Sequence, residues 1–480
     1  MAILDNLEPK RVFKFFEEIS AIPRGSYNTG AISDYLAAFA KERGLEHYQD
    51  ELNNVIIIVP ATAGYENAEA VIIQGHMDMV CQLAPDCTKD MEKEGLELAV
   101  GDGYIYAKGT TLGADDGIAV AMGLALADSG DIPHPRVELV ITVDEETGME
   151  GAAGIDVSPL KAAKFLNIDS EAEGIFTVSC AGVARVECAF EVKRESFAGE
   201  NISIDISGLA GGHSGIEIIK GRANPNILMG RLLYRLVCQQ DARIISLYGG
   251  DKDNAIPTAS TALLCVKDAN SAIELCGKME ALFKAEYAGV DDGLTVRANR
   301  LGDVQLLPLD RADSKKVISF LCCVPNGVQA MSADIEGLVQ TSLNLGILSC
   351  DERAVYVRFS VRSSIESQKE MLFDKLRCLA EALGGSVDIS GNYPGWAYRK
   401  DSPLRELMVK VYSEQTGKEP VIEAIHAGLE CGLFLGQRAD FDCISFGPDI
   451  TDIHTFREKL WIESTQRTWE LLKETLKRIR

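Results

Sequence analysis

The sequence lacks several features that mark well-defined classes of protein. No uninterrupted apolar run reaches the roughly 18 residues that a membrane-spanning helix needs. Residues 1–20 carry charges inside an apolar pattern, which favours an amphipathic helix over an export signal. Basic residues are scarce, with 48 Lys and Arg against 72 Asp and Glu. The net charge of −24 argues against a nucleic-acid partner, which needs a basic face. A membrane partner is not expected either.

Paired cysteine motifs are also missing. The 13 cysteines form no CxxC pair, and only Cys322 and Cys323 are adjacent. Without an export signal, this pattern favours reduced thiols and a cytoplasmic location. A hydrophobic content of 46% and a charged content of 25% are ordinary for a globular protein. The length of 480 residues allows two domains or one large, elaborated domain.

Short apolar runs alternate with helical apolar patterns in the first and last parts of the chain. This alternation predicts an α/β fold in which both parts share one mostly parallel sheet. The expected helices lie at 9–22, 29–43, 118–127 and 462–479, and the expected strands at 54–60, 70–74, 136–143, 165–168 and 442–446.

The character of the sequence changes near 179–184 (SCAGVA) and again near 391–397 (GNYPGWA). Further strands and helices are expected between these points, at 203–207, 225–239, 262–266, 272–287, 355–361 and 368–383. We therefore predict a larger domain made of 1–184 and 397–480, interrupted by an inserted α/β domain at 185–396.

The stretch 71–80, VIIQGHMDMV, ends a predicted strand on His76 and Asp78. Alternate residues of an extended chain point to the same side, so both side chains can face one site. A carboxylate near a histidine orients the ring and raises its basicity, which suits a metal ligand. Taken alone, such a pair is more often a polar strand end that faces solvent.

Other predicted strands are followed in the same way by acidic residues or histidine. Ligands bind at the carboxyl edge of the strands in open α/β sheets, and buried carboxylates need compensating positive charge. Two histidines and at least three carboxylates suit zinc, cobalt or manganese better than calcium. They suit two ions about 3.5–4 Å apart, bridged by a carboxylate and a water. The residues in such positions are His76, Asp78, Asp115, Glu145, Glu146, Asp169 and His454.

Two acidic pairs have ordinary interpretations as well. Asp115 and Asp116 begin a predicted helix, where acids complement the helix dipole. Glu145 and Glu146 would usually be surface charge, but they follow the buried-looking strand VELVITV. One of these two glutamates can bind metal while the other accepts a proton from the bridging water.

Seven segments together resemble a known family. They are GHMDMV, GTTLGADDGIAVA, TVDEETGMEGA, FLNIDSE, GGHSG, HAGLECGLF and FGPDITDIHT. They resemble the aminoacyl-histidine dipeptidases, also called peptidase D, Xaa-His or cytosolic non-specific dipeptidases. These belong to the di-zinc peptidases, with carboxypeptidase G, peptidase V, peptidase T and the aminoacylases. The resemblance covers essentially the whole chain, and it makes the inserted domain a lid of the type that also forms dimers.

The resemblance implies a ligand set. It makes His76, Asp115 and Asp169 ligands of one metal ion, and Asp115, Glu146 and His454 ligands of the other. Asp115 would bridge the two ions. Zinc is the first expectation, with cobalt or manganese as alternatives. A cis peptide bond is expected between Asp115 and the next residue.

The resemblance also implies the remaining roles. Asp78 would orient His76, and Glu145 would be the general base that later protonates the leaving amine. His213, in GGHSG, would stabilise the tetrahedral oxyanion, from its own subunit or from the partner in a homodimer. Without the metal site, His213 would be interpreted as a polar loop tip.

A dipeptidase must also bind a free amino group and a free carboxylate. Glu430 is a candidate for the ammonium side, and His426 can line the same wall. Arg362 is a candidate for the carboxylate. A structural salt bridge is an equal alternative for each of these residues.

We therefore predict metal-dependent hydrolysis of dipeptides, Xaa-His and β-Ala-His included, by a metal-activated water. The alternative enzyme is a related aminoacylase, carboxypeptidase or tripeptidase. A non-catalytic binding protein is a third reading, whose mark would be a missing ligand or base, and all seven core positions are filled.

Overall fold

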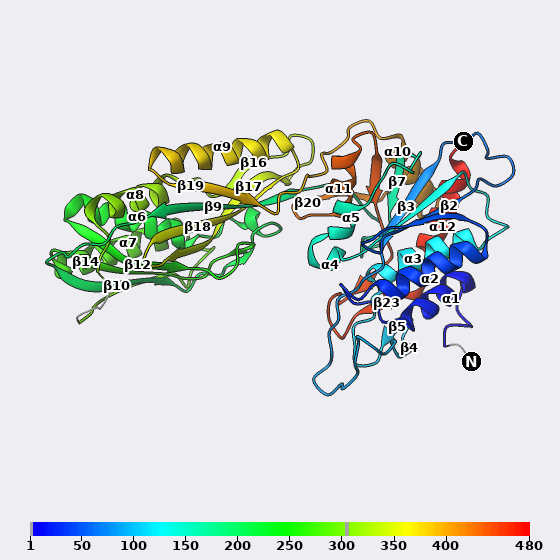
Figure 1. The fold of residues 1–480 in the computed structure, drawn as a ribbon, viewed down its shortest axis with the longest axis horizontal. Helices are drawn as coiled ribbons and strands as arrows, with labels where there is room; N and C mark the ends of the chain where they lie inside the picture. Colours follow the sequence, from blue (N-terminus) through cyan, green and yellow to red (C-terminus); the bar gives the residue numbers. More distant parts are fainter. Residues whose placement is uncertain (1–2, 303–306) are drawn as a thin grey trace. The chain divides into compact units, whose positions relative to one another are not determined.

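The computed structural model describes residues 3–302 and 307–480, which form two compact units (Figure 1). Unit 1 contains Met1–Ser179, Tyr398–Ala424 and Leu429–Arg480. Unit 2 contains Cys180–Ala397 and the short segment Ile425–Gly428. In Figure 1 the blue-to-cyan start and the orange-to-red end of the chain share unit 1, and the green-to-yellow middle forms unit 2. The α/β fold class is confirmed.

Unit 1 is built on an eight-stranded sheet of order β1-β2-β6-β3-β7-β21-β8-β20. Its central pairs, β6–β3, β3–β7 and β7–β21, are parallel. The pairs β1–β2, β2–β6 and β21–β8 are antiparallel. A short turn joins β1 to β2, and such a connection can join only antiparallel strands. The sheet is therefore parallel where the predicted site lies and antiparallel outside it.

The strands of this sheet are β1 (Glu46–Gln49), β2 (Val55–Val59), β3 (Val71–His76), β6 (Val137–Thr142), β7 (Lys164–Asn167), β8 (Ile175–Cys180), β20 (Val421–Ile425) and β21 (Asp442–Ser445). A second, smaller sheet joins β4 (Leu98–Gly101), β5 (Tyr104–Ala107), β22 (Ile450–Thr451) and β23 (Lys459–Trp461). The helices of unit 1 are α1 (Lys10–Ser20), α2 (Gly30–Glu42), α3 (Ala114–Ala127), α4 (Glu145–Gly148), α5 (Glu150–Gly154), α10 (Pro403–Thr416), α11 (Glu430–Gln437) and α12 (Ile462–Arg478).

The centre of the unit 1 sheet is covered on both faces. Every residue of β2, β3 and β6 is buried, so both faces of the sheet are covered here, as is usual where the strands are parallel. The continuous apolar runs of these strands, such as VIIIV in β2, reflect this two-sided burial. The carboxyl ends of β3, β6, β7 and β21 therefore meet at one edge of a rigid, buried sheet.

Unit 2 is built on an antiparallel sheet of order β15-β10-β14-β12-β17-β18-β9-β19, with β16 paired to β17. Its strands are β9 (Gly182–Glu191), β10 (Glu200–Ser207), β12 (Ala242–Gly249), β14 (Ser260–Val266), β15 (Thr295–Arg300), β16 (Gly327–Met331), β17 (Val339–Cys350), β18 (Ala354–Ser363) and β19 (Ser386–Ser390). Two short strands, β11 (Gly212–His213) and β13 (Ala255–Ile256), pair separately. The helices are α6 (Pro225–Gln239), α7 (Ala269–Glu286), α8 (Arg311–Cys323), α9 (Glu366–Ala382) and the 3₁₀ turn η1 (Ile218–Lys220).

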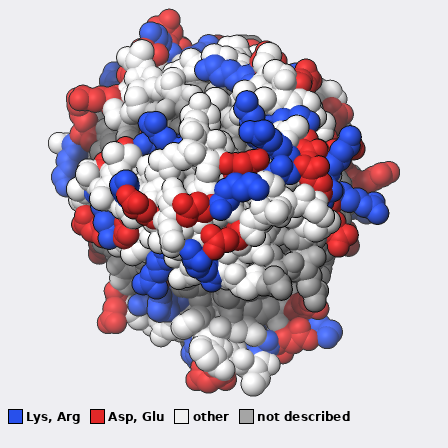
Figure 2. Space-filling model, turned by 90° about the vertical axis from the view of Figure 1, so that its left-hand side faces the viewer, with Lys and Arg blue, Asp and Glu red and all other residues white. Residues whose placement is uncertain are grey.

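Helices cover one face of the unit 2 sheet. Residues of β9 alternate between buried and accessible positions, which is typical of a sheet with one covered face. The core joins this face to α6, α7, α8 and α9, and Phe320 of α8 packs there against Phe190 and Phe359 of the sheet. On the face that Figure 2 shows, lysine and arginine side chains are interspersed with acidic ones. The side of the molecule shown in Figure 2 therefore has no broad patch of charge of one sign.

The start of α3 agrees with the expectation that Asp115 and Asp116 begin a helix. The helix begins at Ala114, after Gly113 in a left-handed conformation with φ 64°. Asp115 and Asp116 have non-helical dihedral angles inside it, and the peptide bond between them is cis, as expected. Within the described residues, none of the helices is both long and apolar enough to span a bilayer.

Candidate metal centre

His76 ends β3 and is fully buried at the carboxyl edge of the unit 1 sheet. Its Nδ1 lies 3.1 Å from the carbonyl oxygen and 3.4 Å from Oδ1 of Asp78. Its Nε2 lies 3.2 Å from Asp115 Oδ1 and 3.4 Å from Asp169 Oδ1. Asp78 thus holds Nδ1, while Nε2 faces two carboxylates. A metal-binding histidine is usually oriented in this way.

The Asp115 carboxylate lies between two histidines from distant parts of the chain. Its Oδ1 faces His76 Nε2, and its Oδ2 lies 3.2 Å from His454 Nε2. His454 follows β22 in a left-handed conformation, and its Nε2 is also 3.0 Å from Glu146 Oε2. The two oxygens of one carboxylate therefore face two separate groups of donor atoms.

Asp78 organises the start of α4. Its Oδ1 accepts a hydrogen bond from the backbone N–H of Glu145 at 3.2 Å, and its Oδ2 accepts one from the N–H of Glu146 at 3.4 Å. Ser26 Oγ donates a further hydrogen bond to Oδ2 at 2.8 Å. Asp78 thus holds His76 and both glutamates in one arrangement.

Glu145 and Glu146 differ in their surroundings. The Glu146 side chain is 6% exposed and contacts His454, whereas the Glu145 side chain is 18% exposed and its Oε2 lies 4.0 Å from His76 Nε2. Burial raises the pKa of Glu145 well above its ordinary value, and nearby Asp169 adds to this effect while His76 opposes it. Glu145 is therefore the more accessible of the pair, and its burial favours the protonated form.

Burial and neighbouring charges shift the pKa values of several groups in the site. Burial raises the pKa values of Asp116 and Asp169. Burial also acts to raise the pKa of Asp115, but hydrogen bonds with His454 and His76 hold it below its ordinary value. Hydrogen bonds to Asp115 and Glu146 raise the pKa of His454 to about 10.

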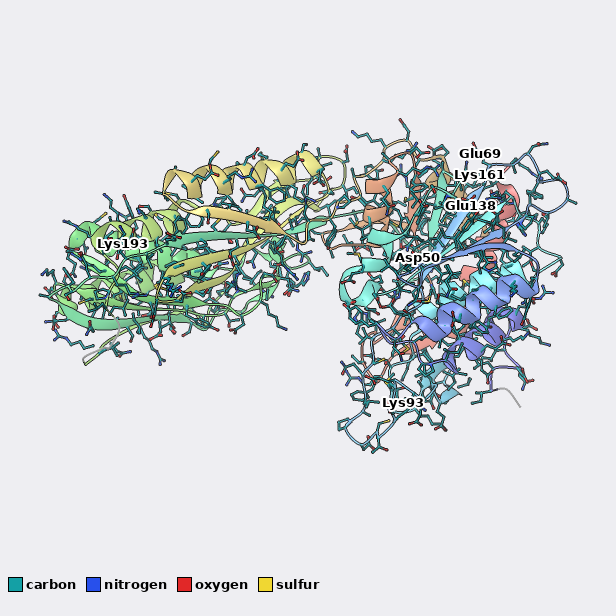
Figure 3. All side chains as sticks on the ribbon, in the orientation of Figure 1. Asp50, Glu69, Lys93, Glu138, Lys161 and Lys193 are labelled. Atoms are coloured by element: carbon teal, nitrogen blue, oxygen red, sulfur yellow. The ribbon has the colours of Figure 1, made fainter. Side chains whose placement is uncertain are left out.

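A buried carboxylate at the other edge of the same sheet is compensated by protein donors, which makes it a useful comparison for this site. Glu138, near the start of β6, accepts hydrogen bonds from Arg136 Nε at 2.8 Å and from the N–H groups of Lys161 and Ala162. Glu138 and Lys161 lie close together at that edge in Figure 3. Every oxygen of Glu138 therefore has a protein donor.

The carboxylates around His76 have no such compensation. Among the described residues, no lysine or arginine forms an ion pair with any of them, and the buried Oε1 of Glu146 has no hydrogen-bond partner. The donor atoms form three groups, and the atoms inside each group lie within 4.8 Å of one another. Divalent cations are the usual remedy for such a cluster. The groups are His76–Asp116–Asp169, His76–Glu145–Glu146 and Asp115–Glu146–His454.

Glu430 lies behind this cluster, at the start of α11. Its side chain is completely buried, and Oε2 accepts hydrogen bonds from Gln74 Nε2 at 2.5 Å and Thr142 Oγ1 at 2.7 Å. Its Oε1 has no partner. Burial raises the pKa of Glu430 to about 8. Its assignment to the ammonium group of a substrate stays a prediction.

Three predicted residues come together in unit 2. A side chain at Gly215 would lie 2.9 Å from His213 Cε1, 3.2 Å from Arg362 Cζ and 2.4 Å from the carbonyl oxygen of His426. The absence of a side chain at Gly215 therefore lets the three residues approach one another. His426 Nε2 also lies 2.7 Å from Ser342 Oγ. Burial, followed by the nearby Arg362 and His213, lowers the pKa of His426 to about 3.

The sequence patterns did not single out two buried charged residues near the cluster. Arg24 lies between Pro23 and Gly25, and Glu458 follows His454 by four positions. Both contact the backbone of the loop before Asp115. The only feature of the sequence that could have pointed to Glu458 is its proximity to the segment that contains His454. No feature of the sequence points to Arg24. The sequence pattern favours a helix-capping role for Asp116, yet its Oδ2 accepts a hydrogen bond from the N–H of His76 at 3.2 Å.

Fold and site together define a class of enzyme. The profile of Peptidase family M20/M25/M40 matches residues 72–478. The chain belongs to this family of metal-dependent peptidases, so the family resemblance and the hydrolase class predicted from the sequence are confirmed.

Particular relatives extend over the full chain. The cytosol non-specific dipeptidase of Escherichia coli is 35% identical over 483 aligned residues, covering 100% of this chain and 99% of the relative. The crystal structure of aminoacylhistidine dipeptidase from Vibrio alginolyticus is also 35% identical, covers 99% of this chain and 98% of its own, and superposes with a TM-score of 0.95. Aminopeptidase PepT from Bacillus cereus shares the fold at 17% identity, with a TM-score of 0.57 over 98% of this chain and 99% of its own.

Divalent metal should stabilise the protein, because cations would offset the buried negative charge around His76. A ligand present at 100 times its dissociation constant stabilises the native state by about 2.7 kcal/mol. We expect the chelated protein to melt at a lower temperature, and added zinc, cobalt or manganese to restore the midpoint. Asp115→Asn should lose most of this response, whereas Glu69→Gln, an exposed acid of the same unit, should keep it. Equal midpoints of native protein with and without metal would contradict this expectation.

Proposed function

We propose that this protein is a metal-dependent dipeptidase that cleaves Xaa-His and other dipeptides, β-Ala-His among them. The observation that carries the proposal is the Asp115 carboxylate, whose two oxygens face His76 and His454 at 3.2 Å each. The names of the Escherichia coli and Vibrio relatives, both dipeptidases at 35% identity, support the substrate class.

Two divalent ions fit this donor set, with zinc as the first expectation and cobalt or manganese as alternatives. We assign His76, Asp115 and Asp169 to one ion, and Asp115, Glu146 and His454 to the other. The contacts of His76 with Asp115 and Asp169, and of His454 with Asp115 and Glu146, support this division. When bound, the ions supply Lewis-acid chemistry, which polarises a carbonyl and acidifies a water.

Glu145 is the general base in this proposal. Its carboxylate is more exposed than that of Glu146, and its raised pKa suits a group that must accept a proton near neutral pH. Asp78 fixes its backbone through the N–H hydrogen bond and orients His76. Glu145 then holds the proton of the attacking water and returns it to the leaving amine.

His213 is assigned to the oxyanion of the tetrahedral intermediate. Its Nδ1 accepts hydrogen bonds from the N–H groups of Gly215 and Ile216, at 3.2 Å and 3.0 Å. The ring proton therefore lies on Nε2, which can donate to a developing negative charge. Burial, with the nearby Arg362, lowers the pKa of His213, which favours the same ring with an unprotonated Nδ1.

Arg362 is assigned to the substrate carboxylate, with His426 on the same wall. The Arg362 side chain is buried, forms no ion pair with any described carboxylate, and has an unpartnered Nε. A buried cation without an anion is costly, and a bidentate carboxylate satisfies a guanidinium well. The free Oε1 of Glu430 leaves that residue as the candidate for the substrate ammonium group.

We also infer a cytoplasmic homodimer. The word "cytosol" in the name of the Escherichia coli relative supports the location. The dimer rests on the resemblance described from the sequence alone.

A substrate panel tests the proposed function. Purified protein is assayed with β-alanyl-histidine, alanyl-histidine, a glycyl dipeptide, a tripeptide and an N-acetyl amino acid, before and after chelation and with metal added back. We expect chelator-sensitive cleavage of the dipeptides alone, because both substrate termini must be free. Cleavage of the tripeptide or the acetyl compound instead would favour a tripeptidase, carboxypeptidase or aminoacylase. No cleavage by the metal-loaded protein would reject catalysis of this kind.

Glu145→Gln should abolish most turnover while metal binding is retained, because the amide cannot accept the proton. General acid–base catalysis contributes about 10²–10⁴-fold, which is the expected loss in kcat. The measurement combines steady-state kinetics with metal analysis of the same sample. Glu150→Gln, which alters an exposed acid in neighbouring α5, should retain near-normal kcat. Substantial activity in Glu145→Gln would remove Glu145 from the role of base.

Arg362→Met should raise KM for dipeptides with a free carboxylate. Hydrogen bonds to charged groups contribute about 1.5–3 kcal/mol, which corresponds to a rise of about 10- to 150-fold. The effect should be much smaller for a dipeptide amide, which carries no carboxylate. The matched control is Arg358→Met on the same strand, where the arginine is half-exposed and paired with Glu187. An equal KM change for acid and amide substrates would contradict the assignment.

A further inference from the structure

Glu458 is a buried carboxylate that accepts hydrogen bonds from four consecutive backbone N–H groups. Its Oε2 accepts from Leu112 at 2.8 Å and Gly113 at 2.9 Å. Its Oε1 accepts from Ala114 at 2.7 Å and Asp115 at 3.4 Å. These groups precede or begin α3, where the backbone N–H groups have no partner within the helix. Glu458 therefore determines where the backbone of Asp115 lies.

The same carboxylate ties this loop to the one that carries His454. Glu458 closes a turn after His454, in which its own N–H donates to the carbonyl oxygen of Thr455 at 3.1 Å. The loop of Asp115 and the loop of His454 are distant in the sequence, and Glu458 joins them. The 3.2 Å approach of His454 Nε2 to Asp115 Oδ2 occurs next to this junction.

Arg24 makes a second junction, between the Asp115 loop and β3. Its Nη2 donates to the carbonyl oxygen of Gly113 at 2.5 Å. Its Nη1 donates to the carbonyl oxygens of Met77 at 2.9 Å and Asp78 at 3.4 Å. Arg24 is completely buried, so these contacts are not shared with solvent. It therefore joins the loop before Asp115 to the residues that follow His76.

Two glycines make room for the Arg24 guanidinium. A side chain at Gly113 would lie 2.6 Å from Nη2, and one at Gly117 would lie 2.5 Å from the same atom. Gly113 also has a φ of 64°, a conformation that L side chains rarely adopt. Gly113 donates its N–H to Glu458 and accepts from Arg24 at its C=O, so both buried charges hold this one residue.

We propose that Glu458 and Arg24 are positioning residues that set the two metal sites separately. Glu458 places Asp115 against His454 and so controls the site of Asp115, Glu146 and His454. Arg24 places the Asp115 loop against β3 and so controls the site of His76, Asp115 and Asp169. The inference rests on the proposed two-metal function and assigns to each ion its own backbone clamp.

The test measures metal affinity rather than turnover. Glu458→Gln leaves two of the four N–H groups facing an amide donor, and Arg24→Lys cannot reach the carbonyl oxygens of both segments. Each variant is made in the native chain, in His76→Ala and in His454→Ala, so that one metal site is removed at a time. Dissociation constants for zinc are measured by competition with a chromophoric chelator, and manganese is followed by electron paramagnetic resonance.

We expect losses of about 10–100-fold in affinity, the range typical of residues that support metal ligands from behind. The loss of zinc affinity caused by Glu458→Gln should be at least about threefold larger in the His76→Ala background, where the His454 site remains, than in the His454→Ala background. The loss of zinc affinity caused by Arg24→Lys should instead be larger in the His454→Ala background, where the His76 site remains, than in the His76→Ala background. In the native chain, either variant should convert the manganese signal of coupled ions to that of a single ion at concentrations that saturate the unmodified protein.

Glu138→Gln is the matched control, because Glu138 also accepts backbone N–H bonds while buried, but at the far edge of the same sheet. It should lower the melting temperature without changing zinc affinity. If Glu458→Gln does not fold, Glu458→Asp takes its place, since the shorter side chain reaches fewer of the four groups.

The outcomes separate the two proposals. Unchanged affinities in the Glu458 and Arg24 variants, or equal losses in both backgrounds, would overturn the separate positioning roles. Binding of fewer than two ions by the unmodified protein would instead reject the two-metal site on which they rest.

Discussion

Buried negative charge at one edge of the unit 1 sheet is the constraint on which the rest of the structure depends. Asp115, Asp116 and Asp169 are removed from water, and among the described residues only histidines form ion pairs with Asp115 and Asp169. At the opposite edge, Glu138 is just as deeply buried but is satisfied by an arginine and two N–H groups. The protein can thus compensate a buried acid when it needs to, and it leaves this cluster to be neutralised from outside.

The backbone around the cluster is arranged to aim side chains rather than to continue regular structure. Gly113, Asp144 and His454 all have left-handed dihedral angles, with φ between 55° and 64°. Gly113 and Asp144 lie just before Asp115 and Glu145, and His454 presents its own imidazole to the cluster. For a non-glycine residue this conformation costs about 1–2 kcal/mol. At Asp144 a side-chain contact offsets part of that cost, because Oδ1 accepts the N–H of Tyr27 at 2.6 Å.

Local sequence patterns predicted those features that depend on local periodicity. The helices near 9–22, 29–43 and 225–239 and the strands before His76 and Glu145 were predicted within a few residues. The prediction that acidic residues and histidines meet at one edge of the sheet followed from the alternation of strands and helices, because each of these residues follows a predicted strand. The antiparallel pairing of β2 with its neighbours and most strands of unit 2 were not predicted, because antiparallel pairing depends on partners far along the chain.

Side chains that bond to distant backbone could not be predicted in the same way. Glu458 contacts Ala114 across 344 positions, and no residue spacing encodes such a contact. Arg24 has an unremarkable sequence context, and only the fold shows that it is buried. The burial of Glu430 also depends on the fold, because its hydrogen-bond donors come from strands β3 and β6, which are distant in the sequence. The sequence identified residues with chemical roles more readily than the residues that hold them in place.

The strand order of unit 1 has a consequence for how the protein is made. Strand β21 lies between β7 and β8, although unit 2 separates it from both in the sequence. During synthesis from the amino terminus, the chain therefore completes nearly all of unit 2 before the central sheet of unit 1 can close. His454 and Glu458 emerge later still. An unfinished chain would present its acidic edge without His454, the last donor of the Asp115–Glu146–His454 group.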